Sequence, residues 1–179
     1  ETSLVTALLA QVDRALISEV PYDPDRVVDL LVADRRANPS SYAVITISEG
    51  AHPAGGQIVQ TGEADAFGHQ KLGGIGATFA DYLKRRSGVG IMVQSLGYLM
   101  RGGPADTLDR MVAINFARIA ADLVLRGESG LMSAVVGGRY ATTPLSETGT
   151  RKVNVERYYD AAEYRPKMDD AVGLPMFLE

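Results

Sequence analysis

Apolar residues gather along the chain in short runs that alternate with longer amphipathic stretches. The runs have the length of β-strands, and the middle one is apolar at nearly every position, as expected for a strand covered on both faces. These runs lie at residues 14–20, 42–48 and 89–96. The amphipathic stretches predict helices at residues 3–11, 24–36, 75–87 and 107–126. Strands that alternate with helices favour parallel βαβ units, so we expect an α/β fold with a doubly wound, mainly parallel sheet.

Capping and turn residues support several of these boundaries. Asp23 and Pro24 supply an N-cap and a first-turn proline for the second helix. Gly137 and Gly138 separate two further apolar runs and form a two-residue turn signal, which predicts a small hairpin near the C-terminus. The two runs of this hairpin lie at residues 131–136 and 139–145.

The regular pattern is interrupted once and then fades. Glycine and alanine dominate residues 50–68, which we interpret as a long loop. Beyond the hairpin we expect a short helix near residues 155–164, followed by an extended tail. The chain therefore divides into a main body at residues 1–145 and a C-terminal helix and tail at residues 146–179.

One glycine-rich stretch carries the strongest chemical signal. Residues 96–110 read LGYLMRGGPADTLDR and join the third predicted strand to the longest predicted helix. Arg101 projects from the loop, Asp106 stands where the helix N-cap would be, and Asp109 follows three residues later. Backbone N–H groups, the helix dipole and a guanidinium would converge here, which predicts an anion site.

The predicted topology brings other polar residues to the same edge. Glu19 follows the first strand, Glu49 the second, and Tyr98 and Arg101 the third. Ligands of open α/β sheets bind outside the carboxyl ends of the strands. Glu49, Tyr98 and Arg101 would then offer a hydroxyl acceptor, a phenolic donor and an anion fork, which together suit a sugar phosphate.

Composition excludes several classes of function. The formal net charge of −4 argues against nucleic acid as a partner, and no apolar run approaches the roughly 20 residues of a membrane span. The chain has no cysteine, which suits the cytoplasm and leaves no thiolate metal site. It begins with Glu1 and has no signal-peptide pattern, so we expect a fragment whose upstream sequence is missing.

The glycine-rich stretch also resembles a known family. LGYLMRGGPADTLDRMVA is similar to the LG[HY]xQRGGxPxxxDRxLA signature of the 6-phosphofructokinases, and the order ALISEVP, YAVITISEGA, KLGGIG and then this loop agrees. The resemblance runs from the first residues to about Leu145. It covers only the C-terminal half of such an enzyme, and therefore implies a phosphofructokinase-like fold without the N-terminal donor-binding half.

The resemblance implies a reaction and a division of labour. It implies phosphoryl transfer from ATP or pyrophosphate, with Mg²⁺, to the 1-hydroxyl of fructose 6-phosphate in glycolysis. Glu49 would bind the sugar, and Tyr98 and Arg101 would lie around its 6-phosphate. Catalytic and metal residues would lie in the missing half, so this chain alone is expected to be inactive. A cytoplasmic homo-oligomer, either a dimer or a tetramer, is implied as well.

Two departures from the family pattern leave alternatives open. Met92 stands where better-known members carry an arginine that reaches the substrate phosphate of a neighbouring subunit. Glu19 matches a glutamate of the bacterial effector site, but its accompanying lysines are absent before Tyr42. The alternatives are the acceptor-binding half of a catalytic enzyme, a non-catalytic regulatory half, and a related kinase or structural domain with an empty pocket.

Overall fold

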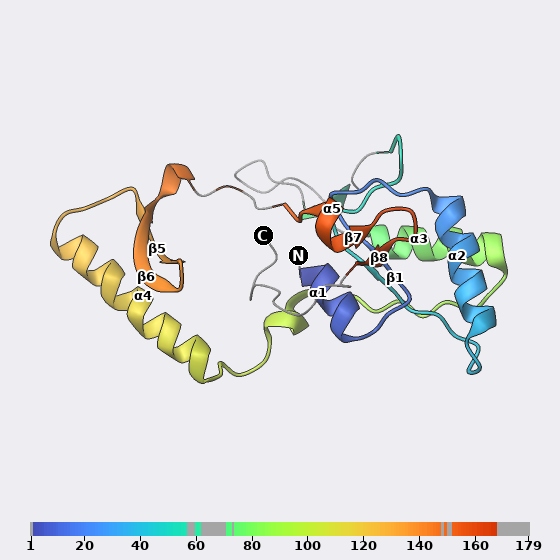
Figure 1. The fold of residues 1–179 in the computed structure, drawn as a ribbon, viewed down its shortest axis with the longest axis horizontal. Helices are drawn as coiled ribbons and strands as arrows, with labels where there is room; N and C mark the ends of the chain where they lie inside the picture. The colour runs from blue at the N-terminus through green and yellow to red at the C-terminus, as the bar shows by residue number, and fades with distance from the viewer. Residues whose placement is uncertain are drawn as a thin grey trace. The chain divides into compact units, whose positions relative to one another are not determined.

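Two compact units make up the chain, and they are described separately below. In the computed structural model, residues 2–56, 60–61, 71–72, 74–147, 149 and 152–167 are described, with the backbone alone at residues 60–61, 71–72 and 101. The first unit joins Glu1–Ser95 to Lys152–Glu179, and the second is Leu96–Arg151 (Figure 1). Residues 152–167 return to pack on the first unit.

The first unit contains most of the short elements. Its helices are α1 (Thr2–Leu9), α2 (Pro24–Ala37), α3 (Ile75–Ser87) and α5 (Val155–Tyr158). Its strands are β1 (Arg14–Leu16), β2 (Ile45–Ile47), β3 (Gln60–Thr61), β4 (Lys71–Leu72), β7 (Tyr159–Asp160) and β8 (Arg165–Pro166). The predicted loop at residues 50–68 is described only in part, and residues 168–179, the predicted tail, lie outside the described residues.

A parallel strand pair lies at the centre of this unit. β1 and β2 pair in parallel, with Arg14 opposite Ile45 and Leu16 opposite Ile47. The other strand pairs of the described chain are antiparallel. The α/β character and the parallel register are therefore confirmed, while both strands are shorter than the apolar runs that predicted them.

The third predicted strand does not form. Residues 89–96 belong to no strand, and Met92 is 95% exposed. Apolar side chains favour extended backbone, but a strand also needs a neighbour that takes up its N–H and C=O groups. In the described chain nothing pairs with this segment as a strand, so the prediction was wrong here.

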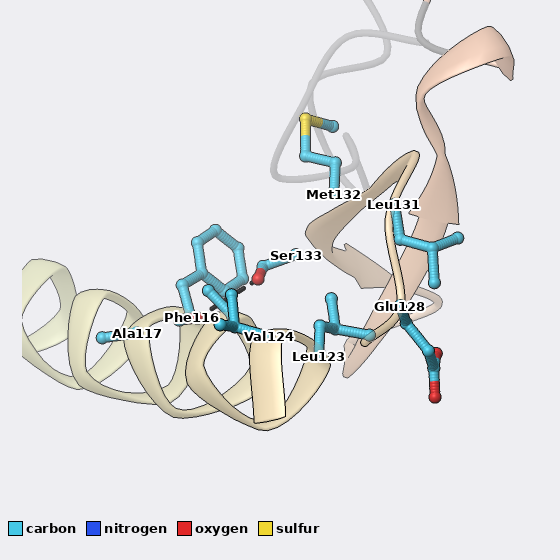
Figure 2. Close-up of a pocket in the computed structure, with 9 residues that line it drawn as sticks. Phe116, Ala117, Leu123, Val124, Glu128, Leu131, Met132 and Ser133 are labelled. Atoms are coloured by element: carbon cyan, nitrogen blue, oxygen red, sulfur yellow. Dashed lines mark hydrogen bonds between the residues drawn. The ribbon is translucent and has the colours of Figure 1, made fainter. Parts of the chain in front are cut away.

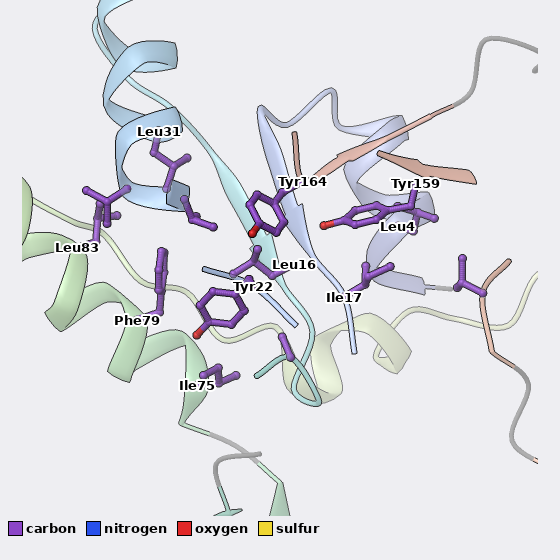
Figure 3. Packing of buried hydrophobic residues seen from close by; sticks show 14 of the residues in the cluster. Leu4, Leu16, Ile17, Tyr22, Leu31, Ile75, Phe79, Leu83, Tyr159 and Tyr164 are labelled. Carbon is purple, nitrogen blue, oxygen red and sulfur yellow. The ribbon is translucent and has the colours of Figure 1, made fainter. Parts of the chain in front are cut away.

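Helices cover the strand pair on two sides. All residues of β1 are buried, and Leu16 and Ile17 belong to the main core cluster. Figure 3 shows Leu31 of α2 and Phe79 of α3 on one side of the strands and Leu4 of α1 on the other. A layered α/β arrangement follows, as expected where a strand pair is apolar on both faces.

Local capping explains where the helices begin and end. The Asp23 side chain accepts hydrogen bonds from the N–H groups of Asp25 and Arg26, and Pro24 follows at the start of α2, as predicted. Gly88 ends α3 in the left-handed conformation, with a φ of 70°. The two helices are joined by Asp25, whose Oδ1 accepts hydrogen bonds from the Tyr82 hydroxyl at 2.8 Å and from Arg86 Nε at 2.9 Å.

The C-terminal segment at residues 152–167 packs on β1 and contributes to the core of the first unit. The predicted helix at residues 155–164 is only α5 in length, because the chain turns into β7 at Tyr159. The Tyr159 hydroxyl donates to the Ala15 carbonyl oxygen at 2.5 Å, and burial raises the pKa of this phenol. The Ala15 N–H in turn donates to the Tyr164 carbonyl oxygen at 2.8 Å. Hydrogen bonds in both directions therefore hold this segment against β1.

A buried arginine joins three parts of the first unit. Arg14 is 4% exposed and contacts Asp34 of α2 through two hydrogen bonds, Nε to Oδ2 at 2.6 Å and Nη2 to Oδ1 at 2.7 Å. Its Nη1 donates to Glu163 Oε2 at 2.8 Å. Burial by itself would lower the pKa of this guanidinium, but the hydrogen bonds to the two carboxylates raise it above its ordinary value.

The second unit is a long helix with a hairpin packed on it. It contains η1 (Gly97–Arg101), α4 (Thr107–Leu125), β5 (Leu131–Val136), β6 (Arg139–Pro144) and η2 (Leu145–Glu147). The hairpin turns at Gly137 and Gly138, which have φ angles of 56° and 76°, so the predicted turn is confirmed. Phe116 of α4 contacts Tyr140 of β6 edge to face, with ring centroids 6.1 Å apart. In the described part of the chain, no helix is long and apolar enough to cross a membrane.

We predict that Arg14→Met destabilises the chain by about 3 kcal/mol, because breaking a buried ion pair leaves a carboxylate without its partner. Among the described residues, Asp34, whose side chain is 10% exposed, would keep the contact with Arg165 Nη2 at 3.0 Å and lose both hydrogen bonds from Arg14. Urea unfolding of Arg14→Met measures this loss. Arg36→Met, at an exposed position of α2, the helix that carries Asp34, is the control, and its free energy of unfolding should stay within about 0.5 kcal/mol of the parent chain. Equal stability of the two variants would contradict the assigned role of Arg14.

Candidate functional site

The carboxyl ends of β1 and β2 form a small polar surface. Glu49 lies in the turn that follows β2 and is exposed. Beside it, Ser18 Oγ and Ser48 Oγ lie 3.0 Å apart, and the Ala51 N–H donates to the Ser48 carbonyl oxygen at 2.9 Å. The segments that follow β1 and β2, which carry Glu19 and Glu49, therefore lie at one edge of the strand pair, and Ser18 and Ser48 contact each other there.

Glu19 has a structural contact in this surface. Its Oε1 accepts a hydrogen bond from the Val153 N–H at 3.1 Å, and so ties the end of β1 to the returning C-terminal segment. Val153 is a core residue, 6% exposed. Because one carboxylate oxygen already holds a backbone donor, Glu19 is better explained as a fold contact than as a ligand for an effector.

Tyr98 and Arg101 lie on η1, in the second unit. Tyr98 is 79% exposed. Three residues complete one turn of such a helix, so positions 98 and 101 start from the same face of η1. η1 lies within the glycine-rich stretch at residues 96–110, and the roles predicted for Tyr98 and Arg101 stay predictions.

The start of α4 is capped by its own carboxylates. Asp106 Oδ1 accepts from the Asp109 N–H at 2.8 Å, and Asp109 Oδ2 accepts from the Asp106 N–H at 3.1 Å. This capping box confirms the predicted cap, and it also places two negative charges at the helix N-terminus. An anion at this loop would therefore depend on Arg101 much more than on the helix dipole.

These residues fall into two groups. Glu49, with Ser18 and Ser48, belongs to the first unit, and Tyr98 and Arg101 belong to the second. Each group is described within its own unit. The predicted convergence of Glu49 with Tyr98 and Arg101 stays a prediction.

The second unit has a hollow of its own between α4 and β5. Its volume is about 660 Å³, and most of its lining is apolar, including Phe116 and Leu123 (Figure 2). The lining residues in the described chain include one carboxylate, that of Glu128, and no cation. The Ser133 hydroxyl already donates to the Phe116 carbonyl oxygen at 3.2 Å. The chemistry of this hollow does not suit a phosphate ester.

Metal binding has no support in the described residues. Among them, no three histidine, cysteine, aspartate or glutamate side chains are grouped so as to hold an ion. Of the two carboxylates of the candidate surface, that of Glu19 accepts the Val153 N–H, and that of Glu49 lies exposed in a turn.

Comparisons with known proteins agree on one family. Residues 2–124 match the family model described as Phosphofructokinase. The chain belongs to the phosphofructokinase family. It is 38% identical over 149 residues to a pyrophosphate–fructose 6-phosphate 1-phosphotransferase of Amycolatopsis mediterranei, which is 82% of this chain and 43% of that protein. It is 33% identical over 156 residues to ATP-dependent 6-phosphofructokinase 2 of Streptomyces coelicolor, which is 87% of this chain and 46% of that protein.

The chain spans less than half the length of these phosphofructokinase relatives. A solved structure, the pyrophosphate-dependent phosphofructokinase of Marinobacter aquaeolei, superposes with a TM-score of 0.61 at 20% identity. The match covers 88% of this chain and 38% of that one. At this identity the likeness establishes the phosphofructokinase-like fold alone.

The sequence analysis did not single out the serine pair. The tripeptide Ile-Ser-Glu stands at the carboxyl end of both strands, at residues 17–19 directly after β1 and at residues 47–49 from the last residue of β2 onward. This repeat is the signal that would have found the serine pair. Because β1 and β2 are parallel, both tripeptides lie at the same end of the strand pair. The register sets Leu16 opposite Ile47, so the two serines are one residue out of step, and their hydroxyl oxygens still lie 3.0 Å apart.

We predict that Glu19→Ala destabilises the first unit by about 1–2 kcal/mol, because the partly buried Val153 N–H loses its acceptor. Amide hydrogen exchange at Val153 should become faster, and chemical unfolding should shift to lower denaturant. Glu19→Gln, which retains a carbonyl oxygen, is the matched control and should restore most of the protection. Unchanged exchange at Val153 in Glu19→Ala would leave the carboxylate available for another role.

Proposed function

We propose that this chain is the sugar-binding half of a 6-phosphofructokinase. The reaction is phosphoryl transfer from ATP or pyrophosphate to the 1-hydroxyl of fructose 6-phosphate. The observation that carries the proposal is the glycine-rich motif around Arg101, in a chain whose residues 2–124 match the family model. The relatives named above use either donor, and the chain itself leaves the donor open.

In this proposal three residues bind different groups of the acceptor sugar. Glu49 accepts a hydrogen bond from a sugar hydroxyl, Tyr98 donates from its phenol, and Arg101 pairs with the 6-phosphate. The exposure of Glu49 and of Tyr98 supports these roles, because both side chains are accessible to a ligand. The two carboxylates that cap α4 support the dependence of phosphate binding on Arg101.

Donor, metal and catalytic base belong to a donor half outside this chain. Phosphoryl transfer requires all three to be held together with the acceptor. The family resemblance assigns the Mg²⁺ that accompanies the donor to that half as well. By "complete enzyme" we mean this chain together with that half, and we propose that it is a cytoplasmic homo-oligomer.

The exposed surface of the second unit supports such a partner. α4 has 19 residues but buries only Leu123. Met111 is 50% exposed, Ile114 61% and Leu125 84%. Apolar area of this kind on a single helix is typical of a surface that another part of a protein covers. The relatives are more than twice as long as the matched region, which supplies an occupant of suitable size.

A non-catalytic regulatory half is the second candidate. Met92 favours it, because this side chain is 95% exposed and a thioether cannot pair with a phosphate. A regulatory half would bind the sugar phosphate through the same residues and would not contribute to turnover.

Our first prediction for the proposed function concerns Arg101→Ala in the complete enzyme. We expect the apparent KM for fructose 6-phosphate to rise by about 10²-fold, since a charge-assisted hydrogen bond of roughly 1.5–3 kcal/mol is lost. Steady-state kinetics with the sugar and the donor varied in turn measure the change. Arg118→Ala, at an exposed position of α4, is the control. Unchanged sugar kinetics in a folded Arg101→Ala variant would exclude the phosphate role.

Our second prediction for the proposed function concerns the chain without the donor half. By itself it should convert no fructose 6-phosphate with ATP or pyrophosphate, and mixing it with the N-terminal part of the Amycolatopsis mediterranei relative should yield fructose 1,6-bisphosphate in a coupled assay. Ile114→Glu should weaken this complementation, because it buries a charge in the apolar contact. Activity of the chain alone that mass spectrometry cannot assign to a contaminant would mean that the catalytic centre lies here. A mixture that binds the sugar without turnover would favour the regulatory alternative.

A further inference from the structure

The turn that carries Glu49 is anchored to both central strands. The Ser48 N–H donates to the Leu16 carbonyl oxygen at 2.9 Å, and the Ala51 N–H closes the turn on the Ser48 carbonyl oxygen at 2.9 Å. The Ser18 and Ser48 hydroxyls, 3.0 Å apart, add a side-chain link between the two strand ends. Glu49 therefore follows directly after Ser48, which is bonded to β1, and precedes Gly50, which lies against Ser18.

Glycine is required at position 50 because of the space that Ser18 occupies and not because of the φ angle of the backbone. Its φ lies outside the left-handed region, so any residue could adopt the conformation. A Cβ atom at this position, however, would lie 2.6 Å from Ser18 Oγ and 3.0 Å from Ser18 Cβ. Rotation of the Ser18 side chain about its Cα–Cβ bond would move Oγ away and relieve the first contact, but it would break the hydrogen bond to Ser48 Oγ. The second contact requires the turn or the end of β1 to move.

We infer that Ser18 and Gly50 are positioning residues for Glu49, and through it for the polyol of the sugar phosphate. This inference rests on the proposed function. An exposed carboxylate on a mobile turn would sample several orientations, and ordering it on binding would cost affinity for the substrate hydroxyl. The serine fills the space beneath Gly50 and bonds Ser48, so the turn is held on both sides of Glu49. Displacement of about 1 Å at such a group can cost about 10²-fold in activity.

The test is a double-mutant comparison in the complete enzyme. Gly50→Ala should raise the KM for fructose 6-phosphate at least about tenfold, while the KM for the donor stays within about twofold. Ser18→Gly removes both clashing atoms, so adding Gly50→Ala to Ser18→Gly should raise the sugar KM no further. Such non-additivity is the signature of two residues in direct contact. Ser48→Ala, which removes only the hydroxyl link, should raise the sugar KM about threefold.

Glu49→Gln separates this inference from the proposed function. If Glu49→Gln leaves sugar use unchanged, Glu49 is not a sugar ligand, and the proposed role of the turn fails together with the inference. If Glu49→Gln weakens sugar binding but Gly50→Ala does not, the function stands and the positioning inference is overturned. Additive effects of Ser18→Gly and Gly50→Ala would also overturn it. Thermal unfolding of each variant shows whether a raised KM reflects misfolding. Ser48→Ala, which adds no bulk to the turn, is the control for the added methyl group.

Discussion

A guanidinium inside the first unit is the contact on which its other parts depend. Arg14 stands at the start of β1, and its two carboxylate partners come from α2 and from the returning C-terminal segment. A buried cation costs several kcal/mol in desolvation unless its partners are present, so these three parts are stable only together. The same strand supplies Ala15, which exchanges hydrogen bonds with Tyr159 and Tyr164. The position of β1 is thus fixed at its N-terminal end by the ion pairs of Arg14, and along its edge by the hydrogen bonds of the Ala15 backbone.

The opposite end of β1 carries the polar residues of the candidate surface. The carboxyl ends of β1 and β2 present Ser18, Ser48 and Glu49, in line with the rule that ligands of open α/β sheets bind there. Glu19 lies at the same end but turns to the Val153 N–H, and so contributes to the fold. Two glutamates that look alike in the repeated Ile-Ser-Glu tripeptide therefore have different environments.

The second unit raises a different question of charge. Glycine-rich loops that lead into a helix often bind anions through the helix dipole. Here Asp106 and Asp109 cap α4 with two carboxylates, which opposes that effect. Phosphate recognition in our proposal therefore depends on a single guanidinium, that of Arg101, with Tyr98 one turn away on η1.

Local signals in the sequence determined a large part of this description. Asp23, Pro24 and Asp106 marked the helix starts, Gly137 and Gly138 marked the hairpin turn, and the phosphofructokinase motif indicated the family. Each of these signals acts through neighbours a few residues away, which is why a single sequence was enough to read them. The tertiary structure decided what depends on distant partners: the absence of a strand at residues 89–96, the return of residues 152–167 to β1, the contact of Glu19 with Val153, and the exclusion of a side chain at Gly50 by Ser18. The strand and the Glu19 contact each depend on a group that satisfies their hydrogen bonds, and that group lies far away along the chain.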